Sequence, residues 1–91
     1  MPRVKIPAPY QGPTQGEGRV EVTATTVRGC IAAVEVRYPG FGPQVFDGAG
    51  GLHKFVKLFL NGDELARTAE ALETVVADAD EVEILAAIGG G

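Results

Sequence analysis

The chain has 91 residues, of which 45% are hydrophobic and 22% charged; this suits one small globular domain and excludes a disordered or fibrous protein. Its 8 basic and 12 acidic residues give a net charge of −4, which makes nucleic acid a poor partner. No apolar run approaches the roughly 20 residues of a membrane span and no signal peptide opens the sequence, so we expect a cytoplasmic protein with no membrane partner.

The N-terminal third predicts a β-hairpin followed by a helix. Residues 4–6 and 19–23 alternate apolar and polar side chains, and the glycine-rich segment 11–18 lies between them as a loop. Thr25 and Thr26 offer N-cap oxygens for a helix that must end before Pro39. Its apolar residues follow the spacing of one helical stripe: Val27, Cys30, Ile31, Val34 and Tyr38.

The remaining elements complete a small mixed sheet. Residues 41–51 carry four glycines and one proline and predict an irregular loop, and 54–60 is the strongest strand signal. A turn at 61–63 leads into a short return strand around Leu65 and Ala66, and 68–76 predicts a loop with a single helical turn. Residues 80–85 form the last strand, with Val82 and Ile84 inward. We therefore expect an α+β fold in which one helix covers one face of the sheet.

The acidic residues are concentrated after Arg67, the last basic residue of the chain. They are Glu70, Glu73, Asp78, Asp80, Glu81 and Glu83. With no basic residue among them, this quarter of the chain predicts a negative field. Two interpretations stay open: a solvated face that keeps the protein soluble, and a surface complementary to a basic partner.

The strand at 54–60 has one aliphatic face and one mixed face. Val56, Leu58 and Leu60 form the first, which we expect to pack against the helix. The second then lies on the open side of the sheet, together with an outward Leu85 on the last strand. These residues predict a partner-binding surface, unless the loop 41–51 folds over them. The residues of this expected partner-binding surface are Phe55, Lys57, Phe59 and Leu85.

Little in the chain predicts catalysis or metal binding. Cys30 lies on the buried helix stripe, where a thiol behaves as a small hydrophobe, and His53 has no paired nucleophile or acid at a useful spacing. The glycine-rich segment 48–51 lacks the Lys and Ser/Thr of a phosphate-binding loop. We therefore expect no catalytic residue, no metal and no cofactor bound by this chain.

The sequence closes on three glycines, which contribute nothing to a core. We expect a domain at residues 1–85 and a flexible tail at 86–91, whose six residues reach about 20 Å. The terminal glycines carry no side chain, so we expect the tail residues Ile88, Gly89 and Gly90 to thread into a narrow channel of a partner and present the carboxylate of Gly91. A frayed end is the alternative.

Several features together resemble the ThiS/MoaD family of ubiquitin-like sulfur carriers. They are the β-grasp order of elements, the stretches 52–56 and 59–64, the acidic strand 80–85 and the Gly-Gly end. The helix end Tyr38-Pro39-Gly40 and the strand entry Lys54-Phe55-Val56 are similar to the branch that serves cysteine biosynthesis. Gly89 departs from the family, in which many members carry a larger residue.

The resemblance implies a ubiquitin-like β-grasp fold and a carrier rather than an enzyme. An E1-like adenylyltransferase/sulfurtransferase would use ATP to adenylate Gly91, sulfur would displace AMP, and the thiocarboxylate would serve a sulfur-accepting biosynthetic enzyme. The pathway stays open among cysteine, thiamine, molybdopterin and a specialised metabolite. We expect a monomer when free. The alternatives are a ubiquitin-like modifier joined to lysines through the same C-terminus, and a plain interaction domain.

Overall fold

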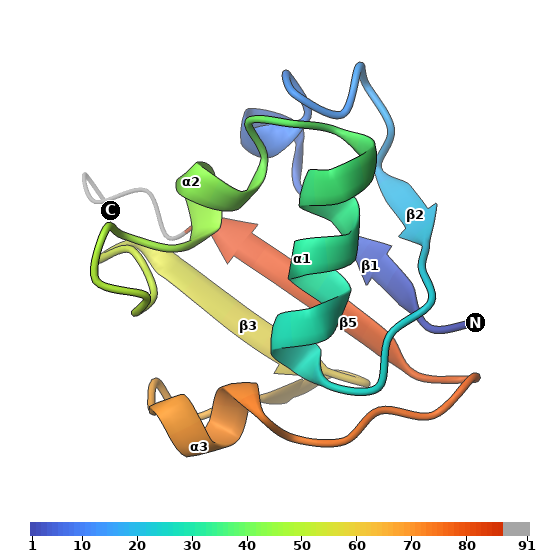
Figure 1. The fold of residues 1–91 in the computed structure, drawn as a ribbon, viewed down its shortest axis with the longest axis vertical. Coiled ribbons are helices and arrows are strands. Elements are labelled where there is room, and N and C mark those ends of the chain that lie inside the picture. Colours follow the sequence, from blue (N-terminus) through green and yellow to red (C-terminus); the bar gives the residue numbers. More distant parts are fainter. Residues whose placement is uncertain (87–91) are drawn as a thin grey trace.

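The computed structural model describes residues 1–86, and in it a five-stranded mixed sheet packs one face against α1 (Figure 1). The strands lie in the order β2-β1-β5-β3-β4. Their bounds are Arg3–Lys5 for β1, Arg19–Glu21 for β2, Val56–Leu60 for β3, Asp63–Glu64 for β4 and Glu81–Ala86 for β5. The helices are α1 (Val27–Arg37), α2 (Gly42–Val45) and α3 (Ala69–Leu72), and a 3₁₀ turn spans Ala8–Tyr10.

The last strand in sequence is the central strand in space. β5 pairs parallel to β1, with Val4 opposite Val82, and antiparallel to β3, with Leu58 opposite Ile84. The expected N-terminal hairpin is confirmed, because β1 and β2 pair antiparallel and bring Val20 opposite Val4. All five of these side chains are buried under the helices, so the sheet contributes one continuous apolar face to the core.

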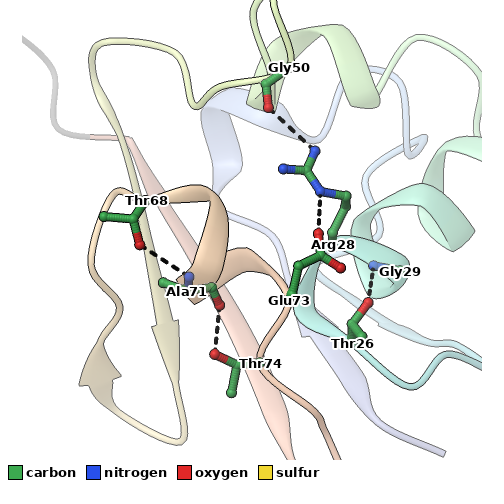
Figure 2. Close-up of polar contacts among 8 residues, drawn as sticks. All are labelled: Thr26, Arg28, Gly29, Gly50, Thr68, Ala71, Glu73 and Thr74. Carbon is green, nitrogen blue, oxygen red and sulfur yellow. Dashed lines mark hydrogen bonds and ion pairs between the residues drawn. The ribbon is translucent and has the colours of Figure 1, made fainter.

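The expected helix is confirmed as α1. The Thr26 hydroxyl accepts the backbone N–H of Gly29 at 3.0 Å, which caps the first turn (Figure 2). The predicted stripe faces the sheet, and its first four residues are fully buried: Val27, Cys30, Ile31 and Val34. Tyr38 donates its backbone N–H to the carbonyl of Val34 as the helix ends before Pro39.

The prediction of an irregular loop over residues 41–51 is wrong at its start, where α2 forms. Pro43 occupies the first turn, where a missing N–H costs nothing, and Phe46 donates its N–H to the Gly42 carbonyl at 2.9 Å. Phe41 and Val45, four positions apart, are both fully buried against the core. The glycine content of the segment concealed this apolar pair, which is what holds the turn in place.

The helical side of the sheet carries more than the single expected helix. Besides α1 and α2, the single turn predicted within 68–76 is confirmed as α3, where the Thr68 hydroxyl accepts the N–H of Ala71 at 3.1 Å (Figure 2). Leu72 anchors this turn in the core. A bridge between Thr26 and Val75 then joins the segment after α3 to the start of α1.

The return strand after β3 begins earlier than the predicted position around Leu65. Asn61 and Gly62 take positive φ angles of 50° and 88°, the pattern of a two-residue type I′ turn. Such a turn allows pairing to start at once, so Leu60 lies opposite Asp63. The two-residue loop, rather than the apolar residues beyond it, sets the register of β4.

The prediction that the C-terminal acidic residues have no neutralising charges is wrong for β5. Because β1 lies beside β5, Lys5 approaches Glu83 at 3.5 Å, and Arg3 and Arg19 both approach Glu81 at 3.8 Å. The sequence places these partners more than sixty positions apart, so they meet only because β1 pairs with β5 and, for Arg19, because β2 pairs with β1. Each pair is partly exposed and contributes modestly to stability.

Asp80 ties the entry of β5 to the β3–β4 turn. Its carboxylate accepts the N–H of Ala77 at 2.8 Å and an amide N–H of Asn61 at 2.9 Å, and these bonds lower the pKa of Asp80 below its ordinary value of 3.8. The Asn61 side chain in turn accepts the N–H of Glu81 at 2.8 Å. The left-handed turn and the first residue of β5 are therefore fixed to one another.

We expect the stability conferred by the Asp80 carboxylate to disappear in acid. A carboxyl whose pKa is depressed on folding stabilises the native state above its unfolded pKa and loses that contribution as the pH falls through the folded value. The free energy of unfolding, measured in urea, should therefore be lower for Asp80→Asn than for the native protein at about pH 7, and the two values should converge toward about pH 2. A difference in the free energy of unfolding that stays constant across this pH range would contradict a stabilising role for the ionised Asp80 carboxylate.

We expect the packing of α1 on the sheet to carry much of the stability. Val34→Ala and Val56→Ala each remove buried methyl groups and should each lower the free energy of unfolding by about 1 to 3 kcal/mol. Val36→Ala is the matched control, because Val36 lies on the same helix but is 83% exposed, and it should change stability by less than about 0.5 kcal/mol. Equal effects at Val34 and Val36 would contradict this packing.

Candidate partner-binding surface and chain exit

The strand predicted at 54–60 begins two residues later, as β3 at Val56, and Lys54 and Phe55 lie in the turn before it. Val56 and Leu58 are buried, whereas Lys57 is exposed, Phe55 is 47% exposed and Phe59 is half-buried. Within β3 the alternation is as predicted, with Val56 and Leu58 toward the core and Lys57 more exposed. Phe55 adds exposed aromatic surface from the turn before the strand.

The neighbouring strands extend this surface in both directions. Leu85 of β5 lies in register with Lys57 and is 38% exposed, which places an aliphatic side chain beside the lysine. Phe59 lies between two carboxylates, because Glu83 of β5 and Glu64 of β4 are its register partners. The sequence analysis missed Glu64, because its position beside Phe59 follows from the register of the turn at 61–62.

Residues 41–51 do not cover the aromatic residues of the open face. The start of the segment packs into the helical side, where Phe41 and Val45 are buried, and the guanidinium of Arg28 on α1 lies 5.1 Å from the centre of the Phe46 ring. Phe55 consequently keeps nearly half of its surface exposed. The surface formed by Phe55, Lys57, Phe59 and Leu85 is accessible, and we call it the open-face surface.

The chain leaves the sheet next to the open-face surface. Ala86, which the sequence analysis assigned to the tail, lies opposite Val56 as the last residue of β5. The residues predicted to thread into a partner and to carry sulfur lie outside the described residues 1–86. They are Ile88, Gly89, Gly90 and Gly91.

The sequence interpretations of Cys30 and His53 are confirmed. Cys30 is fully buried, and burial, with a smaller contribution from the charge of Asp80, raises the pKa of its thiol. His53 is exposed and its Nε2 lies 2.7 Å from the carbonyl oxygen of Pro43, to which it donates as a loop contact. Within residues 1–86 no three His, Cys, Asp or Glu side chains gather to hold a metal, and no helix there is long and apolar enough to cross a membrane.

Comparison with known proteins decides the family. The model of the ThiS family matches residues 4–91. The chain belongs to the ThiS family. Among curated relatives of this ThiS-family chain, the sulfur carrier protein CysO of Mycobacterium tuberculosis is 36% identical over 90 residues, which cover 97% of this chain and 96% of the relative.

Solved structures confirm the ubiquitin-like β-grasp fold expected of a ThiS-family member. A chain of the Amycolatopsis orientalis BexX/CysO complex matches with a TM-score of 0.87 and 33% identity, covering 100% of both chains. The small archaeal modifier protein 1 of Methanosarcina acetivorans matches with a TM-score of 0.78 and 25% identity, covering 99% of this chain and 95% of the other. The resemblance to the CysO type of carrier is also confirmed, both by sequence and by structure.

Proposed function

We propose that this protein is a sulfur carrier whose Gly91 carboxylate is adenylated by an E1-like enzyme and converted to a thiocarboxylate. Two observations support the proposal. The match to the ThiS family runs to residue 91, and the CysO relatives, which are similar over nearly the whole chain, are named sulfur carrier proteins. None of these relatives is named as an enzyme, in keeping with a chain that serves as a co-substrate.

The proposed chemistry has two steps. The carboxylate oxygen attacks the α-phosphorus of ATP, pyrophosphate leaves, and an acyl-adenylate forms. A sulfide or persulfide sulfur then attacks the acyl carbon and expels AMP; with sulfide the product is the thiocarboxylate directly, and with a persulfide a thiol must then reduce the acyl disulfide. Activation is needed because a carboxylate is a poor electrophile and AMP is a good leaving group.

The observation that carries the proposal is the position of the chain exit beside the open-face surface. Leu85 belongs to that surface and is the penultimate residue of β5, so residues 87–91 follow one residue after an exposed contact. Five residues span at most about 18 Å. A partner that binds the open-face surface therefore has the chain end within reach of its own active site.

The conformation of the glycine-rich segment 48–51 supports the proposal that the activating groups come from the partner, because its backbone amides bind a side chain of this chain. Asp47 accepts the backbone N–H groups of Ala49 and Gly51 at 2.9 and 3.1 Å. These are the amides that a phosphate-binding loop would direct at a nucleotide, and a carboxylate in their place repels phosphate. ATP is therefore assigned to the E1-like partner, and a second enzyme accepts the sulfur in biosynthesis.

Incubation with ATP, sulfide and the E1-like enzyme should increase the intact mass by the difference between one sulfur and one oxygen. Gly90→Val should abolish this increase, because a β-branched residue does not fit the narrow channel that slender glycines enter. The matched control is Gly48→Val, at a loop position where an added Cβ meets no atom within 4 Å, and it should gain sulfur normally.

The blocked variant also locates the reactive atom. If Gly90→Val still gained sulfur, the site would lie elsewhere, with Cys30 as the first candidate for a persulfide. The double variant Gly90→Val, Cys30→Ala would show whether the sulfur is on Cys30. Sulfur on the blocked variant that disappears with Cys30→Ala would overturn the proposed mechanism.

Phe59→Lys should weaken binding to the E1-like enzyme by about tenfold or more, because it places a charge within the open-face surface. The fold should survive, since Phe59 is only half-buried. Val36→Lys is the control, because it adds the same charge at an exposed position on α1, and it should bind normally. A large fall in the melting temperature of Phe59→Lys would instead show that Phe59 supports the core.

A second function is favoured by one comparison. The small archaeal modifier protein 1 shares the fold and a quarter of its residues with this chain. As a ubiquitin-like modifier, the chain would form isopeptide bonds between Gly91 and lysines of other proteins. Affinity purification of a tagged chain from its own cells would then recover conjugates larger than the carrier, whereas a dedicated sulfur carrier would be recovered as the free chain.

A further inference from the structure

A groove that shares no residue with the open-face surface lies beside α1. It has a volume of about 450 Å³ and is bounded by the start of α1, the loop before β3 and the segment that includes α3. In Figure 1 the loop and α3 flank α1 on the same side of the view. The residues that line it include Arg28, Arg67, Leu52, Ala69 and Leu72.

Arg28 is held rigidly at one wall of this groove. Its Nε donates to the Glu73 carboxylate at 2.8 Å, one terminal nitrogen donates to the Gly50 carbonyl at 3.3 Å, and its guanidinium stacks on Phe46. Figure 2 shows the second terminal nitrogen without a dashed bond, on the side of the guanidinium that faces Thr68 and Ala71. A fixed donor is therefore available to a ligand without further loss of side-chain entropy.

Arg67 is held at another wall by backbone carbonyls. One terminal nitrogen donates to the carbonyl of Val56 and the other to the carbonyl of His53, the latter at 2.7 Å. A guanidinium has five N–H donors, so donors remain after these two bonds. Within residues 1–86 no carboxylate lies within ion-pairing distance of Arg67, so its charge is not neutralised there.

The groove combines these two cations with an apolar lining. Leu72 is buried, Leu52 is half-buried, and Ala69 adds a small side chain. No acidic residue is among the residues that line the groove, although the whole chain carries a net charge of −4. Because Arg28 is paired with Glu73, the unneutralised positive charge of the recess is that of Arg67, and the apolar lining leaves room for an aliphatic stem.

We propose that this groove binds an acidic side chain from a peptide segment of a protein partner. The carboxylate would pair with the free edges of Arg28 and Arg67, and its methylene stem and apolar neighbours would contact Leu52 and Leu72. Arg28 is already paired with Glu73 through Nε, so its free terminal nitrogen contributes an oriented hydrogen-bond donor, while Arg67 contributes the charge that attracts the carboxylate. The net negative charge of the chain favours a single carboxylate over a multiply charged phosphate ligand.

This site gives the carrier a second docking face. α1 covers one face of the sheet and the open-face surface occupies the other, so a partner in the groove and a partner on the open face would not compete for the same side chains. A carrier that passes between an activating enzyme and a sulfur acceptor could then engage the second before it leaves the first. The binding itself does not depend on sulfur transfer.

Titration of the ¹⁵N-labelled protein with acetyl-Leu-Glu-Leu-amide tests the proposal. The amide resonances of Gly50, Gly51 and Ala69 should shift saturably, and the matched acetyl-Leu-Gln-Leu-amide should bind at least about tenfold more weakly because it lacks the charge. Arg67→Gln and Arg28→Gln should each weaken binding of the Glu peptide by a similar factor. Arg37→Gln, an exposed arginine at the end of α1 outside the groove, should leave binding unchanged.

Three results would overturn the proposal. They are equal binding of the Glu and Gln peptides, resonance shifts confined to the open-face surface, and displacement of the peptide by an equal concentration of inorganic phosphate, which would indicate a site for small anions. The two peptides are compared on the unaltered protein, so the test stands even if an arginine variant fails to fold. Neither ATP nor an activating enzyme is present, so failure here is separate from failure of sulfur loading at Gly91.

Discussion

The insertion of β5 between β1 and β3 is the constraint on which the rest of the structure depends. Val82 pairs with Val4 on one side and Leu60 on the other, Ile84 pairs with Leu58, and both are fully buried, so the core is incomplete until the last strand is in place. A strand that is last in sequence and central in space delivers the chain end from the middle of the sheet rather than from a frayed edge. The domain thereby fixes the origin of the segment after Ala86 with the central strand of its sheet.

The same strand pairing determines which charged side chains of the sheet lie next to one another. The basic residues of the N-terminal hairpin and the acidic residues of β5 are neutralised in part by one another, since Lys5 meets Glu83 and Glu81 meets two arginines. The negative field that the acidic C-terminal quarter suggests is consequently weaker on the sheet. What remains distinctive on the open face is apolar surface around Lys57, which selects partners by shape and contact more than by charge.

Periodicity predicted the elements whose side chains obey one local rule. The stripe of α1 and the two faces of the strand at 54–60 could be read from the sequence because burial follows a period of 3.6 or 2 residues. Local rules fail where structure depends on distant residues. α2 depends on Phe41 and Val45 reaching the core, β4 depends on the geometry of a two-residue turn, and the groove depends on Arg28 and Arg67, which are thirty-nine positions apart in sequence.

The position of the only cysteine bears on where sulfur can be handled. Cys30 is fully buried beneath α1 and its thiol pKa is raised, so the nucleophilic thiolate is disfavoured and a sulfur donor has no path to it in the folded state. A persulfide there would also add an atom to a closely packed core, which is destabilising. The burial of Cys30 therefore disfavours sulfur chemistry in the core, which agrees with the proposal that sulfur is carried at Gly91, in the segment that follows the central strand.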